Sequence, residues 1–277
     1  MATTFRDVMI GVVAMATLGG SINAAELTIT AADGSIRTHD TEQFLSSPAL
    51  QTIVIENDIG YGRIMTYQAV PLVSLIPDHD AVDDQTGLQV LATDGYAANL
   101  PLPLVIQDGD DGARAWLAIE PQDAKWPNLP GKDVSAGPFS VVWSNQAAFG
   151  IMPQQWPYQV ASLSYAPFPA TRWPQLALAD GVTDAARRGQ TVFVDQCLVC
   201  HRMNVAGLAA LGPDLNIPMN PTQYFQPAAL ALLIRDPAQV RQWPDMQMHG
   251  FDPVDLSDSD IDDVVAYLAA MAETVPE

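Results

Sequence analysis

Five consecutive residues of this chain have the types and spacing for redox chemistry: Cys197-Leu198-Val199-Cys200-His201. Cys-x-x-Cys-His is the spacing of covalent c-type haem attachment. Two intervening residues allow both thiols to reach the two vinyl groups on one edge of a single haem. His201 then follows at the place of the proximal iron ligand. The sequence therefore predicts one covalently bound haem c per chain, attached through Cys197 and Cys200, with His201 as a metal ligand.

Two other roles of a Cys-x-x-Cys pair compete with this interpretation. A redox dithiol of the thioredoxin kind begins a helix after a strand, whereas residues 190–196 before this motif are helical in pattern and no βαβ unit surrounds it. A structural zinc site needs a second pair of Cys or His ligands. The chain has only 2 cysteines, both in the motif, so neither alternative explains it as well as haem does.

Length and charge limit the classes of partner. A chain of 277 residues is longer than one small core requires, so two domains are expected. The net charge is −20, with 32 acidic against 12 basic residues. This balance argues against nucleic acid and anionic membrane surfaces as partners. It fits either a merely solubilising surface or docking to a redox protein partner with a basic docking surface.

The N-terminus has the pattern of an export signal. Residues 8–20 form an uncharged apolar run that is too short to span a bilayer, and Ser21-Ile22-Asn23-Ala24-Ala25 provides a zone of small residues for cleavage. We expect a cleaved signal peptide over residues 1–25, in preference to an uncleaved anchor or a buried helix. Covalent haem attachment in bacteria also takes place outside the cytoplasmic membrane. The sequence thus predicts a periplasmic protein without a stable membrane span in the mature chain.

Residues 26–166 are predicted to form a β-rich α+β domain. Short apolar runs rich in β-branched and aromatic residues alternate with Asp-Gly, Pro-Gly and Gly-Pro turn signals, including those at residues 108–112. Short helices are expected at residues 41–45 and 70–76. The predicted strands are residues 27–30, 52–55, 88–91, 115–119, 138–143 and 159–165.

This first segment resembles the sulfite-oxidase-like molybdopterin-binding fold. The resemblance rests on Tyr67-Gln68-Ala69-Val70-Pro71-Leu72-Val73-Ser74-Leu75-Ile76, together with residues 94–96, 137–142 and 156–160. Catalytic members of that family use a cysteine thiolate as a molybdenum ligand, and this segment has no cysteine. The resemblance therefore implies the fold without the catalysis, as a scaffold for docking or for binding a small ligand. His39 and His79 are interpreted as solvated loop histidines, in preference to metal ligands.

The pattern changes after a proline-rich stretch. Three prolines favour a semi-rigid linker over residues 167–182, and an all-α domain is expected over residues 183–277. Thr183 or Asp184 can cap the first helix, in which Gly189, Phe193 and Cys197 recur at steps of four. Ser257 with a carboxylate three residues later predicts a capping box on the last helix, whose apolar stripe begins at Ile261.

These helices resemble those of class I cytochromes c. In that family a glycine on the first helix permits close crossing by the last one, which makes Tyr267 the candidate to pack against Gly189. Gly212-Pro213-Asp214-Leu215 resembles the family turn in which the proline carbonyl accepts a hydrogen bond from the proximal histidine. The resemblance thus assigns Pro213 to cofactor binding.

The resemblance also suggests the distal iron ligand. Met248-His249-Gly250-Phe251 matches the family register, so Met248 is the expected second metal ligand, with Met246 and His249 as alternatives. Arg241 and Trp243, in the segment leading to that methionine, are candidates for cofactor binding through the haem propionates, although a surface arginine remains open. Met203 and Met219 are interpreted as pocket or surface residues.

The predicted function is that of a periplasmic electron-transfer cytochrome with a His/Met-ligated haem. One alternative is a molybdopterin-dependent oxidoreductase that passes electrons to an intrachain haem c. Another is a binding or sensor protein whose haem reports redox state or gas. Enzyme activity is left open, but a non-catalytic electron-transfer protein is favoured and no residue is assigned as catalytic, because nothing in the haem segment supplies an acid, a base or an open iron site.

Overall fold

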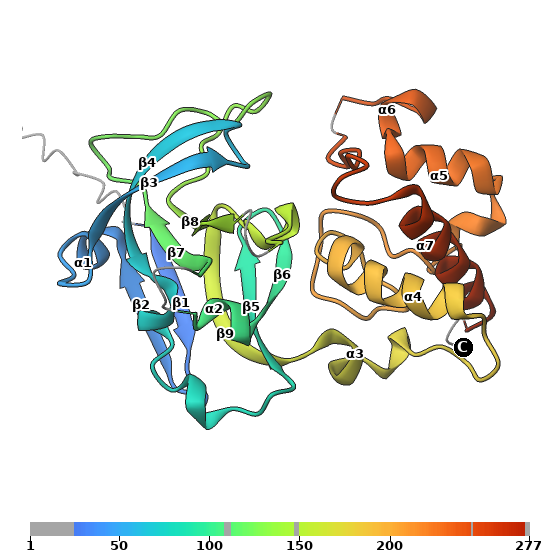
Figure 1. Ribbon diagram of the computed structural model, residues 1–277, viewed down its shortest axis with the longest axis horizontal. Helices are drawn as coiled ribbons and strands as arrows, with labels where there is room; N and C mark the ends of the chain where they lie inside the picture. Colours follow the sequence, from blue (N-terminus) through green and yellow to red (C-terminus); the bar gives the residue numbers. More distant parts are fainter. Residues whose placement is uncertain (1–24, 108–111, 147–149, 245, 275–277) are drawn as a thin grey trace, which may run out of the picture.

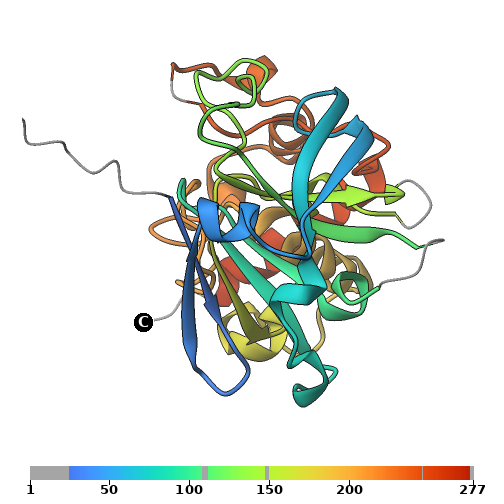
Figure 2. The ribbon, with the colours of Figure 1, turned by 90° about the vertical axis from the view of Figure 1, so that its left-hand side faces the viewer.

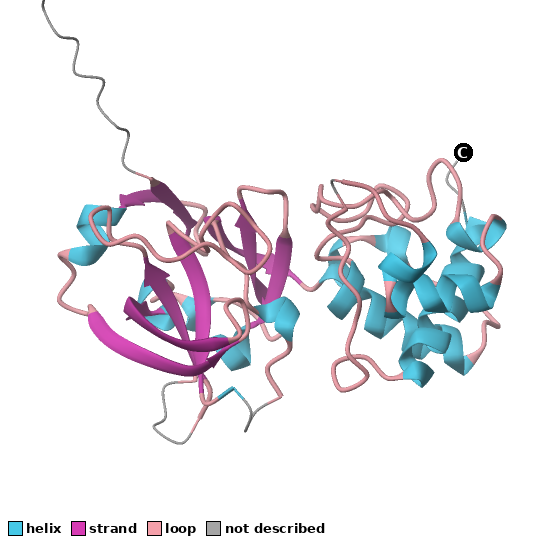
Figure 3. Cartoon of the chain, turned by 90° about the horizontal axis from the view of Figure 1, so that it is seen from above, coloured by secondary structure: helices cyan, strands magenta, loops and turns pink. Residues whose placement is uncertain are grey.

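A computed structural model describes residues 25–107, 112–146, 150–244 and 246–274. The chain forms a β-rich lobe followed by a helical lobe, and the two lie next to each other (Figures 1 and 3). Of the expected signal peptide only Ala25 is described, so that prediction lies outside the described residues. The turn signals at residues 108–111 lie outside them as well.

Two sheets build the β-rich lobe. Five strands follow the order β2-β1-β9-β5-β6, and four follow the order β3-β4-β7-β8 (Figure 1). Figure 2 shows this lobe facing the viewer. All described pairings are antiparallel except that of β1 with β9, which places the last strand of the lobe between the first strand and β5. The strands are β1 (Glu26–Thr30), β2 (Ile36–Asp40), β3 (Gln51–Asp58), β4 (Arg63–Pro71), β5 (Thr86–Ala92), β6 (Ala97–Pro101), β7 (Arg114–Ile119), β8 (Phe139–Ser144) and β9 (Val160–Pro167).

One hydrophobic core lies inside this lobe. Leu27 and Ile29 on β1 are buried at alternate positions, which is the period of a strand with one face turned to the core. The largest buried side chains, Tyr67, Phe139 and Trp143, come from β4 and β8. The short helical turns of the lobe are α1 (Thr41–Leu45), η1 (Leu72–Leu75), η2 (His79–Ala81), α2 (Leu102–Val105) and η4 (Pro153–Gln155).

The β-rich prediction is confirmed in outline, with two local corrections. The helix expected over residues 70–76 is mostly wrong, because β4 continues to Pro71 between β3 and β7 and leaves only the single turn η1. His39 is not a loop residue: it lies on β2 and stacks on Phe44 with ring centroids 5.3 Å apart. The helix at Thr41–Leu45 is confirmed, with Asp40 as its N-cap.

The helical lobe is organised around the crossing of its first and last helices. Thr183 caps α4 through a hydrogen bond from Ala186 N, and Ser257 with Asp260 forms the expected capping box on α7. Phe193 and Tyr267 are buried at the crossing, with ring centroids 5.1 Å apart. The elements are α4 (Asp184–Val192), the π-helical turn η6 (Phe193–Cys197), η7 (Pro221–Gln223), α5 (Pro227–Arg235), α6 (Pro237–Val240), α7 (Asp258–Met271) and η8 (Ala272–Thr274).

The proline-rich segment between the lobes is ordered and partly packed. It contains α3 (Pro169–Arg172) and η5 (Pro174–Leu176), each started by a proline. Leu176 is fully buried in the helical lobe, and its carbonyl accepts hydrogen bonds from Gln190 Nε2 at 2.7 Å and the Tyr267 hydroxyl at 3.2 Å. The end of the segment therefore belongs to the packing of the α4–α7 crossing. The exact domain limits remain a prediction.

Candidate haem site

The helix before the cysteines changes its pitch just ahead of the motif. In η6 the amide of Leu198 bonds to the carbonyl of Phe193, five residues earlier, at 2.9 Å. The expected step of four therefore holds from Gly189 to Phe193, and the wider turn interrupts it before Cys197. Such π-type turns within helices are frequent at functional sites. The amide of His201 then bonds to the Cys197 carbonyl at 2.8 Å, which closes the motif into a compact loop.

The two cysteines are free and half-buried, and they face different cores. Cys197 packs on the core of the helical lobe, whereas Cys200 packs on the core of the β-rich lobe. Burial raises the pKa of each thiol to about 12. Cys200 adds a smaller increase to the pKa of Cys197, and Asp94 adds one to the pKa of Cys200. Unattached, both sulfurs are therefore neutral thiols next to apolar surface. That surrounding suits the apolar edge of a macrocycle better than it suits a metal ion.

His201 is held in one orientation. Its Nδ1 lies 2.9 Å from the carbonyl oxygen of Pro213, which makes Nδ1 the donor and leaves Nε2 free to act as a ligand. Burial lowers the pKa of His201, so the neutral imidazole is favoured. A Cβ on Gly212 would lie only 2.5 Å from ring atoms of His201, so a glycine is needed there. The structure thus brings His201 and Pro213 together as expected.

The segment expected to supply the distal ligand runs along the helical lobe. Met248 is half-buried and packs on the same core as Cys197, whereas Met246 does not contact that core. His249 stacks near Phe251 with ring centroids 5.5 Å apart, and burial lowers its pKa, with a smaller effect of Lys132 in the same direction. This placement favours Met248 over Met246. The assignment of Met248 to iron stays a prediction.

Arg241 and Trp243 lie together on the surface. The Arg241 guanidinium stands over the Trp243 ring, 4.9 Å from its centroid, and 5.9 Å from the centroid of Phe225. Both residues are exposed. The pair therefore offers a cation and an indole N–H beside the segment that leads to Met248. Their binding of haem propionates stays a prediction.

The side chains present fit a covalently bound haem. A c-type haem requires two thiols separated by two residues, an imidazole as one iron ligand and a second iron ligand such as a thioether. The chain supplies the thiols of Cys197 and Cys200, the imidazole of His201 oriented by a carbonyl, and the thioether of Met248 on the same core as Cys197. Within the described ranges, no group of three or more His, Cys, Asp or Glu residues could hold a metal ion. His39 and His79 accordingly take no part in such a group.

A buried asparagine ladder, which the sequence analysis missed, holds the loop after His201. Asn220 Nδ2 donates to Asn216 Oδ1 at 2.7 Å, and Asn216 Nδ2 donates to Asn204 Oδ1 at 2.8 Å. The same amide groups donate to the carbonyls of Leu268 and Met271 near the end of α7. The ladder thereby ties the loop that carries Pro213 to the last helix. Three single asparagines without periodicity give no signal that would predict it.

Backbone contacts between the lobes were also missed. The amide of Ala97 donates to the Val199 carbonyl at 3.0 Å, and the amide of Ala210 donates to the Gly95 carbonyl at 2.9 Å. Val199 itself is buried in the core of the β-rich lobe. The two residues between the cysteines thus join the lobes. The sequence signal for this contact was the apolar pair Leu198-Val199 between the two cysteines.

Residues 186–272 match the family model of cytochrome c. This C-terminal part of the chain is therefore a cytochrome c domain, the class of electron-transfer protein that binds haem c covalently. No curated protein matches the chain. For the β-rich lobe, the resemblance to the molybdopterin-binding fold remains a prediction. Among the described residues, no helix is both long and apolar enough to cross a bilayer.

Proposed function

We propose that this chain is a periplasmic electron-transfer cytochrome that carries one haem c. Cys197 and Cys200 attach the macrocycle, and His201 and Met248 ligate the iron. The hydrogen bond from His201 Nδ1 to the Pro213 carbonyl carries the proposal, because it presents Nε2 of a neutral ring in a fixed direction. An export signal over residues 1–25 and a basic docking surface on the redox partner belong to the same proposal.

When bound, the haem would supply a one-electron redox couple. The protein holds the residues around the haem in fixed positions. The Pro213 carbonyl and the close fit at Gly212 restrict rotation of the His201 ring. The asparagine ladder holds the loop that presents this carbonyl, and the core under Met248 holds the thioether. With His201 and Met248 both bound in the two oxidation states, a haem iron would have no open position, and the reorganisation on electron transfer would be small. A thioether ligand also favours a higher reduction potential than a second imidazole.

The β-rich lobe is proposed to serve as a scaffold rather than as a molybdenum enzyme. Its resemblance to the molybdopterin-binding fold suggests the architecture, and the chain has no cysteine outside the haem motif to act as a molybdenum ligand. The net charge of −20 supports association with a basic partner surface. Electron delivery from an intrachain molybdopterin is the competing function that the experiment must separate.

The test is purification of the full chain from a host that matures c-type cytochromes. We expect a pigmented protein with a six-coordinate low-spin spectrum in both redox states, whose pigment stays with the polypeptide in acidified organic solvent. Elemental analysis should return iron without molybdenum, and N-terminal sequencing should begin near Glu26. A colourless product, extractable haem or a high-spin ferric spectrum would refute the cytochrome. Stoichiometric molybdenum would establish the competing oxidoreductase.

A further inference from the structure

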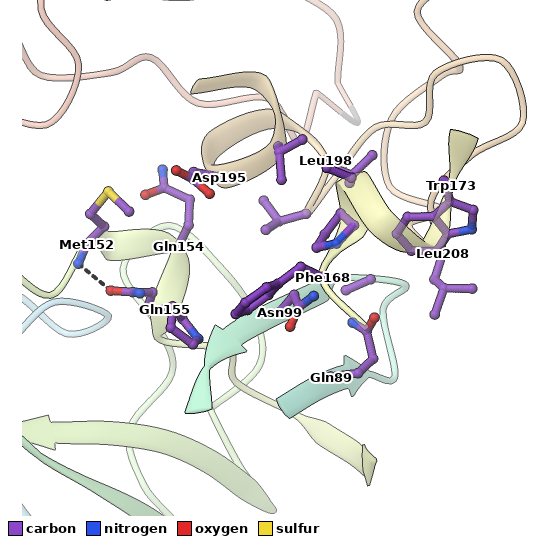
Figure 4. Close-up of a pocket in the computed structure, with 16 residues that line it drawn as sticks. Gln89, Asn99, Met152, Gln154, Gln155, Phe168, Trp173, Asp195, Leu198 and Leu208 are labelled. Atoms are coloured by element: carbon purple, nitrogen blue, oxygen red, sulfur yellow. Dashed lines mark hydrogen bonds between the residues drawn. The ribbon is translucent and has the colours of Figure 1, made fainter. Parts of the chain in front are cut away.

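A cavity of about 260 Å³ is lined by residues of both lobes (Figure 4). Leu198 and Val199, the residues between the two cysteines, form part of its wall. Further apolar surface comes from Phe168 and Trp173 of the connecting segment, and from Leu208 of the loop after His201. The cavity is therefore built by both lobes and has a mainly apolar body. A dry cavity of roughly 150 Å³ already accommodates benzene, so a molecule with one ring and a short substituent fits this volume.

Two buried polar atoms of the cavity wall, Gln154 Oε1 and Asn99 Oδ1, have no hydrogen-bond partner in the described structure. Gln154 is 5 % exposed, and its Oε1 makes no hydrogen bond in the described structure. The next residue differs, since Gln155 Oε1 accepts from the Met152 amide at 2.8 Å. A buried acceptor without a donor destabilises the fold, and a ligand with a donor group would recover that loss. Gln154 Oε1 is thus an open hydrogen-bonding position of the site.

A carboxylate stands at the same end of the cavity. Asp195 lines it next to Val194, and Figure 4 shows Asp195 and Gln154 at one end of the view. Asp195 is exposed, and within the described residues its carboxylate has neither an ion pair nor a hydrogen bond. Partial loss of water beside the cavity wall raises its pKa. An unpaired carboxylate beside an apolar wall attracts a cation. Two acceptors, the Asp195 carboxylate and Gln154 Oε1, therefore lie at the same end of the cavity.

Arg172, the cation of the connecting segment, is already engaged by two residues of the cavity wall. Arg172 Nη1 lies 3.4 Å from Gln89 Oε1, and its guanidinium stands 4.6 Å from the Trp173 ring centroid. Trp173 stands at the opposite end of the view in Figure 4 from Asp195. Arg172 thus adds positive charge near one end of the cavity and leaves the Asp195 end without a counter-charge. A ligand with its positive charge at the Asp195 end suits this distribution.

We propose that the cavity is a binding site for a small primary amine with an apolar body about the size of one ring. The ammonium group donates to the Asp195 carboxylate and to Gln154 Oε1. The apolar body packs against Phe168, Leu198 and Leu208. Neither the redox partner nor the identity of the iron ligands enters this assignment.

The test is calorimetric titration of the full haem-loaded chain with benzylamine, with benzyl alcohol as the uncharged comparison. We expect one benzylamine per chain, and benzyl alcohol bound at least tenfold more weakly. Asp195→Asn should weaken benzylamine binding at least tenfold and Gln154→Met several-fold. Ala170→Trp, at an exposed rim position, should block binding without disturbing the core. The matched control is Asp123→Asn, which removes an exposed carboxylate of the β-rich lobe and should leave the affinity unchanged.

Three results would overturn the site. Equal affinity for benzylamine and benzyl alcohol would show that the charge is not recognised. Several molecules bound per chain, weakened equally by Asp123→Asn and Asp195→Asn, would show general attraction to an acidic protein. A change of iron coordination during the titration that survives Asp195→Asn would place the amine on the haem instead. If Gln154→Met fails to fold, Asp195→Asn and Ala170→Trp still decide the outcome.

Discussion

Gly189 on α4 lies directly against the backbone carbonyl of Asp263 on α7. A Cβ at residue 189 would fall far inside contact distance of that carbonyl and 3.0 Å from the Cβ of Tyr267. Beside this contact, Arg188 donates to both carboxylate oxygens of Asp263, at 2.7 and 2.8 Å. The missing side chain of Gly189 thus sets how closely the two helices cross, and the ion pair fixes their register.

Gly189→Ala is expected to destabilise the cytochrome domain by about 3 kcal/mol, because backbone on α7 has to move to admit a methyl group. Chemical unfolding followed by the haem absorbance measures this loss. The control is Arg187→Ala, which changes an exposed residue of α4 two positions before Gly189. It should change the free energy of unfolding by no more than about 0.5 kcal/mol. Similar stabilities of the two variants would contradict the close crossing.

Asn216→Leu is expected to cost about 3 kcal/mol, since it leaves Asn204 Oδ1 and the Met271 carbonyl without their shared donor in a buried place. The loop that carries Pro213 should also loosen, so hydrogen exchange of residues 204–216 should accelerate. Gln242→Ala, an exposed change in the same domain, is the comparison. A variant as stable as this comparison would mean that the ladder does not support the loop.

Met248→Ala should abolish the six-coordinate low-spin spectrum and lower the reduction potential by on the order of 0.1 V, because the thioether is lost from the iron. Met246→Ala removes the same group two residues earlier and should keep both properties. Absorption spectra and redox titration distinguish the two variants. The reverse pattern would move the distal ligand to Met246, and an unaltered spectrum in both would point to His249.

Asp58→Asn tests a buried carboxylate in the β-rich lobe. Asp58 accepts hydrogen bonds from the Tyr67 hydroxyl at 2.7 Å and the Tyr61 amide at 2.8 Å, yet burial dominates and raises its pKa. A folded-state pKa above the unfolded value contributes stability that is present in acid and lost as the pH rises through the folded pKa. The stability of Asp58→Asn relative to the wild type should therefore increase from about pH 4 to about pH 7.

Urea unfolding of both proteins across that range measures the difference, and groups common to both cancel. A difference that is flat, or that falls with rising pH, would show that Asp58 is ionised in the fold without cost.

The sequence by itself determined the chemistry and the helices that carry it. The Cys197–His201 spacing predicts haem attachment because thioether bonding demands a local geometry, and the caps at Thr183 and Ser257 act within one turn of helix. The same holds for the strands. β1 is buried at alternate positions because one of its faces is turned to the core, whereas the runs that became β5, β7 and β8 are almost wholly buried and are therefore continuously apolar. Structures that depend on such local constraints can be predicted from the sequence without knowledge of tertiary contacts.

Only the tertiary structure decided how distant segments meet. The parallel pairing of β9 with β1, the asparagine ladder and the cavity beside Asp195 each join residues that are far apart in the chain. The burial of Val199 against the β-rich lobe is of the same kind. No local propensity encodes such contacts, because their energy comes from complementary surfaces of two elements. For that reason the haem motif was evident from its spacing, whereas its place at the junction of two lobes was not.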